Sequence, residues 1–360
     1  MNKISLFIIF AYMTSVCILY SNEPVPYRLI NSDHLQAFRT GDEYITRLRG
    51  NVHFFYDNIE FKADRADIYD VQQHVILSGN VVIIQDTLSM TALEAQYFHQ
   101  TQLLRAQGNV VMTETDCEGA FRRVTSNIAT HHRDTGEFIL QGNVHASDFR
   151  DSLFATAGHA FFNQQDGYGY LIQRPVVWRT GDNPLSMSAE KIEFFQENNK
   201  VVASFNVVTH NDDIRATCNF LIYYGDEGRV IYIGEPRFYS ESGDGHADLI
   251  TIYLDGNDVR EIVMEGNSFI YFRAEAVGEK DNWVSSNNMV LLYSDNRPSE
   301  FIARENVQSF IRQVGASRRQ AMINDVAGES LTISFDENAD IDQLNITERI
   351  RGKYRFERRR

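Results

Sequence analysis

Apolar residues recur at alternate positions in short runs along most of this chain. One kind of run comes just before a Gly-Asn pair, as Val75 and Leu77 do before Gly79. A second kind has apolar residues spaced two, two, three and two apart, as in Ile59, Phe61, Ala63, Ala66 and Ile68. Alternation predicts strands with one buried face, and the step of three keeps the apolar set on that face across a bulge or corner. No long segment has the spacing of an amphipathic helix, so the pattern predicts an all-β fold.

The runs repeat with a nearly fixed period. Gly-Asn-Val occurs four times, at Gly50, Gly79, Gly108 and Gly142, in steps of 29, 29 and 34 residues. Aligning the apolar runs extends the series in steps of 32, 31, 29, 32 and 39 residues to Arg174-Pro175-Val176, Phe205-Asn206-Val207, Gly234-Glu235-Pro236, Gly266-Asn267-Ser268 and Glu305-Asn306-Val307. A last, partial copy is expected at Leu344 and Ile346, before Glu348. Periods of this length are typical of stacked repeats.

We therefore predict about nine stacked repeats of 29–39 residues over residues 22–350, forming either one elongated domain or two stacked halves. Each repeat is expected to contain about three short strands. The Gly-Asn pair is expected at a turn that requires positive φ, because both residues tolerate that conformation, and to be structural rather than a ligand site.

The two ends of the chain have their own compositions. Residues 1–21 resemble an export signal, with Lys3 before an apolar run and the small residue Ser21 at the expected cleavage point. An uncleaved membrane anchor and a lipidated Cys17 are the alternatives. Residues 351–360 are expected to form a solvated basic tail, or else to contact anionic headgroups or an acidic partner.

Net charge and cysteines exclude some classes of protein. The formal charge of −15 argues against binding to nucleic acid, which needs a basic face. Cys117 is expected in a loop that lengthens the third repeat, and Cys218 at an inward corner position three repeats later. A disulfide between them is not expected, because its two Cα atoms would have to lie within about 7 Å.

The search for chemistry finds no catalytic motif and predicts no enzyme, metal or cofactor. His131-His132-x-Asp134 could bind a metal in principle. Its alignment with Tyr97 and Phe162 instead predicts that His131 occupies a wall position of its repeat. A carbohydrate-active β-helix enzyme would need acidic and basic residues clustered repeatedly on one wall, and no such cluster is visible.

The repeated constellation is apolar. Residues two and four positions after each glycine site form a stripe, which is either a closed core or a groove that admits acyl chains. A bound chain would gain about 0.8 kcal/mol for each buried CH₂ group. The candidate lipid-binding residues, from this stripe and the strands beside it, are Val52, Phe54, Phe61, Val81, Ile83, Met90, Val110, Met112, Val144, Val176 and Trp178.

The motif Gly50-Asn51-Val52-x-Phe54, followed by Phe61-x-Ala63-Asp64-x-Ala66-x-x-Tyr69 and Leu77-x-Gly79-Asn80-Val81, resembles the OstA-like family. That family includes LptA, LptC and the periplasmic part of LptD. The resemblance is strongest over residues 44–145 and can be traced to about residue 350.

The resemblance implies an open, twisted β-jelly-roll in the periplasm that binds the acyl chains of lipopolysaccharide or a related envelope lipid. It also implies end-to-end strand pairing with other OstA-like proteins of the inner- and outer-membrane transport complexes. The leading hypothesis is thus a non-enzymatic lipid bridge. The alternative is a structural β-repeat protein of the cell envelope with a closed core.

Overall fold

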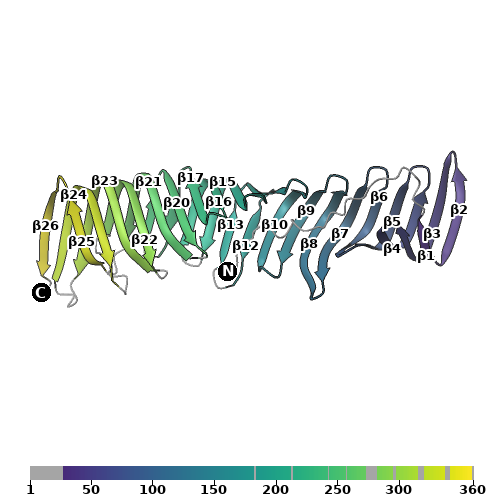
Figure 1. Cartoon of the computed structure of the whole chain (residues 1–360), viewed down its shortest axis with the longest axis horizontal. Coiled ribbons are helices and arrows are strands. Elements are labelled where there is room, and N and C mark those ends of the chain that lie inside the picture. The colour runs from purple at the N-terminus through teal and green to yellow at the C-terminus, as the bar shows by residue number, and fades with distance from the viewer. Residues whose placement is uncertain are drawn as a thin grey trace. The chain divides into compact units, whose positions relative to one another are not determined.

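The computed structural model describes residues 27–181, 184–211, 214–241, 243–256, 258–272, 282–294, 297–314, 320–336 and 341–358 (Figure 1). These residues form strands and turns, and among them no helix is long and apolar enough to cross a membrane. The chain divides into two compact units. The N-terminal unit contains the described residues up to Gly181 together with Glu190–Asn199, and the C-terminal unit contains those of Asp182–Ala189 and Lys200–Arg360. The predicted export signal and Cys17 lie outside the described residues.

In the N-terminal unit, successive strands pair antiparallel. Its strands are β1 (Arg28–Asn31), β2 (His34–Thr40), β3 (Glu43–Tyr56), β4 (Ile59–Tyr69), β5 (His74–Gln85), β6 (Leu88–Phe98), β7 (Leu103–Asp116), β8 (Gly119–His132), β9 (Glu137–Asp148), β10 (Leu153–Asn163), β11 (Tyr168–Ile172), β12 (Val176–Arg179) and β14 (Lys191–Phe195). From β3 to β10 each strand pairs along its whole length with the next, so the repeats stack in sequence order.

The C-terminal unit follows the same antiparallel plan. Its strands are β13 (Leu185–Ser188), β15 (Lys200–Asn211), β16 (Ile214–Tyr224), β17 (Arg229–Ile233), β18 (Arg237–Tyr239), β19 (Gly243–His246), β20 (Leu249–Asp255), β21 (Asp258–Phe272), β22 (Asn282–Ser294), β23 (Arg297–Val314), β24 (Gln320–Phe335), β25 (Ile341–Thr347) and β26 (Arg351–Arg358). The predicted all-β fold of stacked repeats is confirmed.

The Gly-Asn pairs are β-bulges. Gly50 and Asn51 together face the single residue Asp64 of β4, between the paired residues Arg49 and Arg65 on one side and Val52 and Ala63 on the other. Both bulge residues have positive φ, 76° and 47°. All ten copies of the repeat have such a pair, including the degenerate ones at Gln173-Arg174, Phe205-Asn206, Gly234-Glu235, Glu305-Asn306 and Glu348-Arg349. The expected positive φ is confirmed, and the partial copy before Glu348 is a real one.

The expected division of each repeat into three short strands is wrong. In the first four repeats a single strand runs through the bulge, as β3 does from Glu43 to Tyr56, so each repeat is two long strands. The strand breaks without a following proline at the Glu348-Arg349 bulge, between β25 and β26. Two further breaks lie where proline follows the bulge, at Pro175 between β11 and β12 and at Pro236 between β17 and β18. Proline has no N–H to donate to the ladder, which explains both breaks.

The sequence alignment of the fifth repeat was wrong by one residue. The positive-φ pair is Gln173-Arg174, not Arg174-Pro175. Because the proline ring fixes φ near −65°, Pro175 cannot take the asparagine position. It takes the valine position instead, so the buried residues of this strand are Pro175 and Val177, and Val176 and Trp178 lie on the opposite face.

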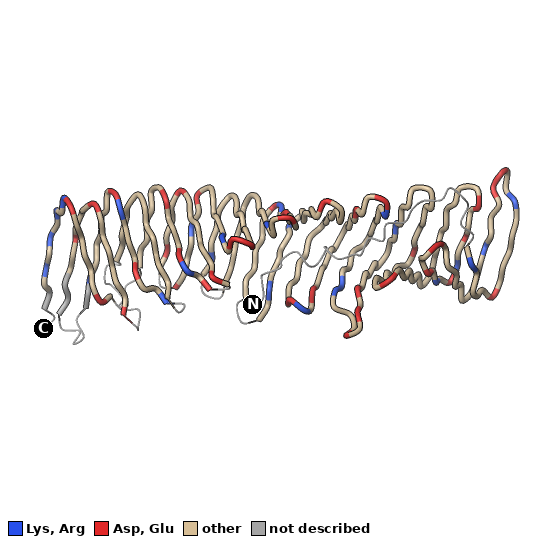
Figure 2. Tube along the Cα trace, in the orientation of Figure 1, with Lys and Arg blue, Asp and Glu red and all other residues tan. Residues whose placement is uncertain are grey.

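The basic C-terminal segment is mostly a strand rather than a tail. Residues 351–358 form β26, which pairs antiparallel with residues 320–327 of β24. Lys353 and Arg355 are exposed on this strand, and basic residues are spaced along it in Figure 2. The last two residues, Arg359 and Arg360, lie outside the described residues.

Candidate functional site

The interior of the N-terminal unit lies between two walls, which meet at the bulges. The leading wall is formed by the strand halves that precede each bulge and by their partners, for example 43–49 and 65–69. The trailing wall is formed by the halves that follow, for example 52–56 and 59–63. Rings from the two walls meet inside: Phe61 of the trailing wall lies 5.7 Å from Tyr97 of the leading wall, between ring centroids. We call the turns furthest from the bulges, such as 57–58, 99–102 and 133–136, the rim.

Nine of the eleven candidate residues point into this interior. They are at most 5% exposed, and they are Val52, Phe54, Phe61, Val81, Ile83, Met90, Val110, Met112 and Val144. Phe54 stacks on Phe61 with ring centroids 5.2 Å apart, so neighbouring strands supply one continuous apolar layer. Their role as lipid ligands stays a prediction.

The other two candidates, Val176 and Trp178, do not belong to this layer. Trp178 stacks on Phe154 with a centroid distance of 5.6 Å, on the outward face of β10 and β12. Their assignment to the stripe is corrected by the register of β12 against β10, in which Val177 pairs with the buried Ala155.

The interior is filled by its own side chains. Phe54 and Phe61 are fully buried by neighbouring side chains, and Met90 and Met112 are nearly so. An acyl chain could enter only by separating these contacts or by displacing flexible side chains. Methionine is suited to that, because its unbranched side chain repacks at low cost.

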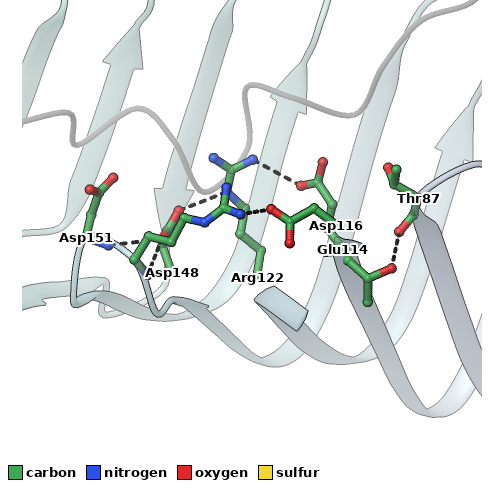
Figure 3. A network of polar contacts seen from close by, with 8 residues as sticks. Thr87, Glu114, Asp116, Arg122, Asp148 and Asp151 are labelled. Atoms are coloured by element: carbon green, nitrogen blue, oxygen red, sulfur yellow. Dashed lines mark hydrogen bonds and ion pairs between the residues drawn. The ribbon is translucent and has the colours of Figure 1, made fainter. Parts of the chain in front are cut away.

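Towards the rim, charged side chains replace the apolar layer. Six positions after the glycine, where the first repeat has Tyr56, the third and fourth repeats have Glu114 and Asp148. Arg122 reaches both, with Nε 2.8 Å from Asp148 and Nη1 3.0 Å from Glu114 (Figure 3). Asp148 is completely buried and also accepts backbone N–H groups of Arg150 and Asp151. A buried charge is tolerated only when it is paired in this way.

This charged cluster continues outward along the same turns. Arg150 forms an ion pair with Asp116, which lies in the long β7–β8 hairpin beside the exposed Cys117. Burial, and then repulsion from Asp148, raises the pKa of the Asp151 carboxyl. In Figure 2 acidic residues are found at several of the turns. Cys117 lies in the lengthening loop as predicted.

On the leading wall, the rim is occupied by Arg133. Its Nη1 donates to Gln102 Oε1 at 2.6 Å and to the Tyr97 hydroxyl at 3.0 Å. Its Nη2 donates across the interior to Asn58 Oδ1 at 3.3 Å, on the β3–β4 turn of the trailing wall. Burial raises the pKa of Tyr97 to about 12. This contact could not be predicted from the sequence, because Asn58 and Arg133 lie 75 residues apart and belong to no common motif.

At the corner, the bulge asparagines act structurally, as expected. Asn80 Nδ2 donates to Asp64 at 2.9 Å, and Asn51 Nδ2 donates to Asp33 at 3.1 Å. Asn267 makes the equivalent bond to Asp248 at 2.8 Å. Each of these amides therefore ties a bulge to the acidic residue that faces it. These groups are exposed, and nothing directs them towards a common ligand.

The histidine and cysteine positions follow the repeat. His131 occupies the predicted wall position and stacks on Phe138 with a centroid distance of 3.7 Å. Burial, and then the nearby Arg133 and His132, lower its pKa to about 3. Cys218 is buried at its corner, and burial raises its pKa to about 11. Both described cysteines are free thiols, and no described His, Cys, Asp and Glu side chains form a group of three that could hold a metal ion.

Comparison with known proteins gives a family for part of the chain. Residues 60–168 match the family described as LptA/(LptD N-terminal domain) LPS transport protein. This segment lies within the N-terminal unit and includes most of the buried candidate residues. The resemblance inferred from the Gly-Asn-Val motif is confirmed over these residues, and the matched family is one of transport proteins.

A search of solved structures lists the crystal structure of LptH, the LptA homologous periplasmic component of the conserved lipopolysaccharide transport device from Pseudomonas aeruginosa. The identity is 12%, and the match covers 46% of this chain and 76% of that chain with a TM-score of 0.14. No curated protein matches the sequence.

Proposed function

We propose that this chain, with residues 60–168 matching the lipopolysaccharide transport family, is a non-enzymatic periplasmic component that shields lipid acyl chains on their way to the outer membrane. The observation that supports it best is the apolar layer of the N-terminal unit, which places Ile83, Met90 and Met112 on one continuous inward face. The cargo would be lipopolysaccharide or a related envelope lipid.

The physical basis is exchange of one apolar contact for another. An acyl chain that enters between the walls would replace side-chain packing by chain packing, and each CH₂ removed from water contributes about 0.8 kcal/mol. The sugars and phosphates of the lipid would remain at the rim, where polar and charged side chains replace the apolar layer. The chain supplies a surface for transit, and the energy and direction would come from partners.

End-to-end pairing with other proteins of the same fold is part of the proposal. Among the described strands, β1 and β2 pair only with β3, and β25 and β26 pair only with β24. Each pair therefore leaves one edge open to a further strand, which is a common mode of association.

The alternative is a structural protein of the envelope with a permanently closed core. Its support is the burial of the layer, since Phe54 and Phe61 are fully covered by other side chains. On this account the walls never part, and the apolar layer serves stability alone.

Photo-crosslinking distinguishes the two accounts with a matched pair of positions. Ile83 points inward and the neighbouring Ile84 points outward on the same strand. A photoreactive residue at position 83 is expected to form adducts with lipopolysaccharide in the native envelope, and one at position 84 is not. Absence of adducts at position 83, in a variant that is folded and exported, would reject the lipid-binding proposal in favour of the closed core.

A further inference from the structure

We infer that Arg133 and Asn58 form a latch, called here the rim bridge, that holds the two walls of the N-terminal unit together and controls access to its apolar interior. The inference rests on the proposed function for the nature of the cargo, but the latch itself rests on geometry alone. The hydrogen bond from Arg133 to Asn58 joins the β8–β9 turn to the β3–β4 turn, across the interior.

The bridge is anchored on one side and weak on the other. On the leading wall Arg133 donates to Gln102 and Tyr97, which are nearly or fully buried, at 2.6 and 3.0 Å. The Arg133 backbone N–H also donates to the Gln102 carbonyl at 3.0 Å. On the trailing wall its single partner is the exposed amide of Asn58 at 3.3 Å. The contact that breaks first is therefore the one to Asn58, and Arg133 remains with the leading wall.

The acceptors of Arg133 are all neutral. Within the described ranges no carboxylate lies within ion-pair distance of Arg133, although Asp57 is next to Asn58 in the chain. A carboxylate partner would make a stronger, charge-assisted bond than an amide does. The choice of an amide at position 58 leaves the bridge closed at rest and easily opened.

Beneath the bridge, aromatic rings continue the closure. Tyr56 of the trailing wall lies 5.9 Å from Tyr97 and 5.0 Å from His99, measured between ring centroids and with the rings nearly perpendicular. These rings cover Phe61, which lies next to Tyr97. Release of Asn58 would let Tyr56 move with the trailing wall and uncover this part of the layer. In the chain the bridge spans the first to the third repeat.

Two substitutions at the exposed position 58, one truncating and one isosteric, should change the strength of the rim bridge in opposite directions. Asn58→Ala removes the acceptor without touching either wall, and Asn58→Asp replaces it with a carboxylate of the same shape. The first should open the walls and the second should hold them closed. The effect of Asn58→Asp should disappear when combined with Arg133→Gln. Arg123→Gln, at an exposed position of β8, is the matched control.

The primary readout does not involve lipid. Spin labels at Thr87→Cys and Thr101→Cys, exposed in the β5–β6 and β6–β7 turns, report the separation of the walls in a Cys117→Ser, Cys218→Ala background. We expect a longer and broader distance distribution for Asn58→Ala, a narrower one for Asn58→Asp, and no change for Arg123→Gln. Identical distributions in all variants would overturn the latch.

The second readout is the rate of photo-crosslinking from position 83 to phosphatidylethanolamine vesicles that contain lipopolysaccharide. We expect at least a twofold faster rate for Asn58→Ala and a slower one for Asn58→Asp. Equal rates despite altered distances would overturn control of access. Altered distances with no lipid adduct in any variant would leave the latch standing and reject the proposed lipid function.

Discussion

The corner and the rim of the N-terminal unit are built by different rules. At the corner every repeat has the same conformation, a bulge with two positive-φ residues, whether its residues are Gly50-Asn51 or Gln173-Arg174. At the rim, equivalent positions hold Tyr56 in one repeat and the buried Asp148 in another. The corner sets the stacking of the repeats, and the rim is where single repeats acquire contacts of their own.

In two of the corners, one of the two facing positions carries a side chain and the other is glycine, with the roles exchanged between the bulge and the facing strand. A Cβ atom on Gly79 would lie 2.9 Å from the Cβ of Asp64, so glycine is required there. In the fifth repeat the relation is reversed: the bulge holds Gln173, and the facing residue is Gly158, which has no room for a Cβ beside it.

The largest expected effect is at the rim. Asp148→Ala would leave Arg122 buried without its closest carboxylate, which typically destabilises a protein by about 3–5 kcal/mol. The equivalent change in the second repeat, Gln85→Ala, should cost less than about 1 kcal/mol, since Gln85 carries no charge and is half-buried. Chemical denaturation of both variants measures the difference. Equal losses would contradict the view that the rim differs from repeat to repeat.

The second-largest expected effect tests the exchange of glycine and a side chain between the bulge and the residue that faces it. Gly79→Gln should destabilise by about 1–3 kcal/mol, because it combines positive φ with a clash against Asp64. The double variant Gly79→Gln, Asp64→Gly reproduces the pair found at Gln173 and Gly158 and should recover most of the loss. Denaturation midpoints of the two variants decide the matter, and a double variant no more stable than the single one would disprove the exchange.

Between corner and rim, His131 makes stability depend on pH. Its folded pKa, about 3, lies below the ordinary value of 6.5, so the unfolded chain binds the proton more readily. The stabilisation is complete above pH 6.5 and is lost as pH falls from there towards 3, with a slope of up to about 1.4 kcal/mol per pH unit. His131→Phe, which places a phenyl ring where Phe162 has one, should flatten this part of the curve. Other histidines with lowered pKa values, such as His74 and His99, remain in both proteins, so the comparison isolates His131.

The smallest expected effect is that of an exposed corner amide. Asn80→Ala removes one hydrogen bond to Asp64 and places alanine at a φ of 47°, for a total of about 1 kcal/mol. Asn109→Ala is the control, because the residue facing that bulge is Leu93. Asn109→Ala should lose only the part of the stability that comes from placing alanine at positive φ. Thermal unfolding of the two variants compares them, and a larger loss for Asn109→Ala would contradict a role for the amide bond.

The corner was predictable from the sequence, because its requirements are local. Positive φ selects glycine and asparagine, alternation selects the inward residues, and both recur at a fixed period, so Val52, Val81 and Val110 could be placed inside. The error at Val176 and Trp178 was avoidable, since a proline could not have occupied the asparagine position of the bulge. At Pro236 the sequence alignment and the structure agree, with proline at the valine position after Gly234 and Glu235.

The rim was not predictable in the same way. The contact between Asn58 and Arg133 depends on two turns brought together by stacking, and neither residue stands out in its own repeat. Glu114 and Asp148 lie at regular inward positions, six residues after the glycine of their repeats. The predicted stripe includes only the second and fourth residues after each glycine. Alternation extended by two residues predicts that both carboxylates point inside. Their shared partner, Arg122, is evident only from the fold.

We propose that the apolar layer of this chain carries lipid. Native mass spectrometry of the full chain isolated gently from its own envelope tests it most directly. The account predicts a folded protein with bound lipid of the mass of an acylated, phosphorylated glycolipid, and a larger bound fraction for Asn58→Ala than for Asn58→Asp. Folded protein that carries no lipid in any of these forms would contradict the account and leave a closed structural core.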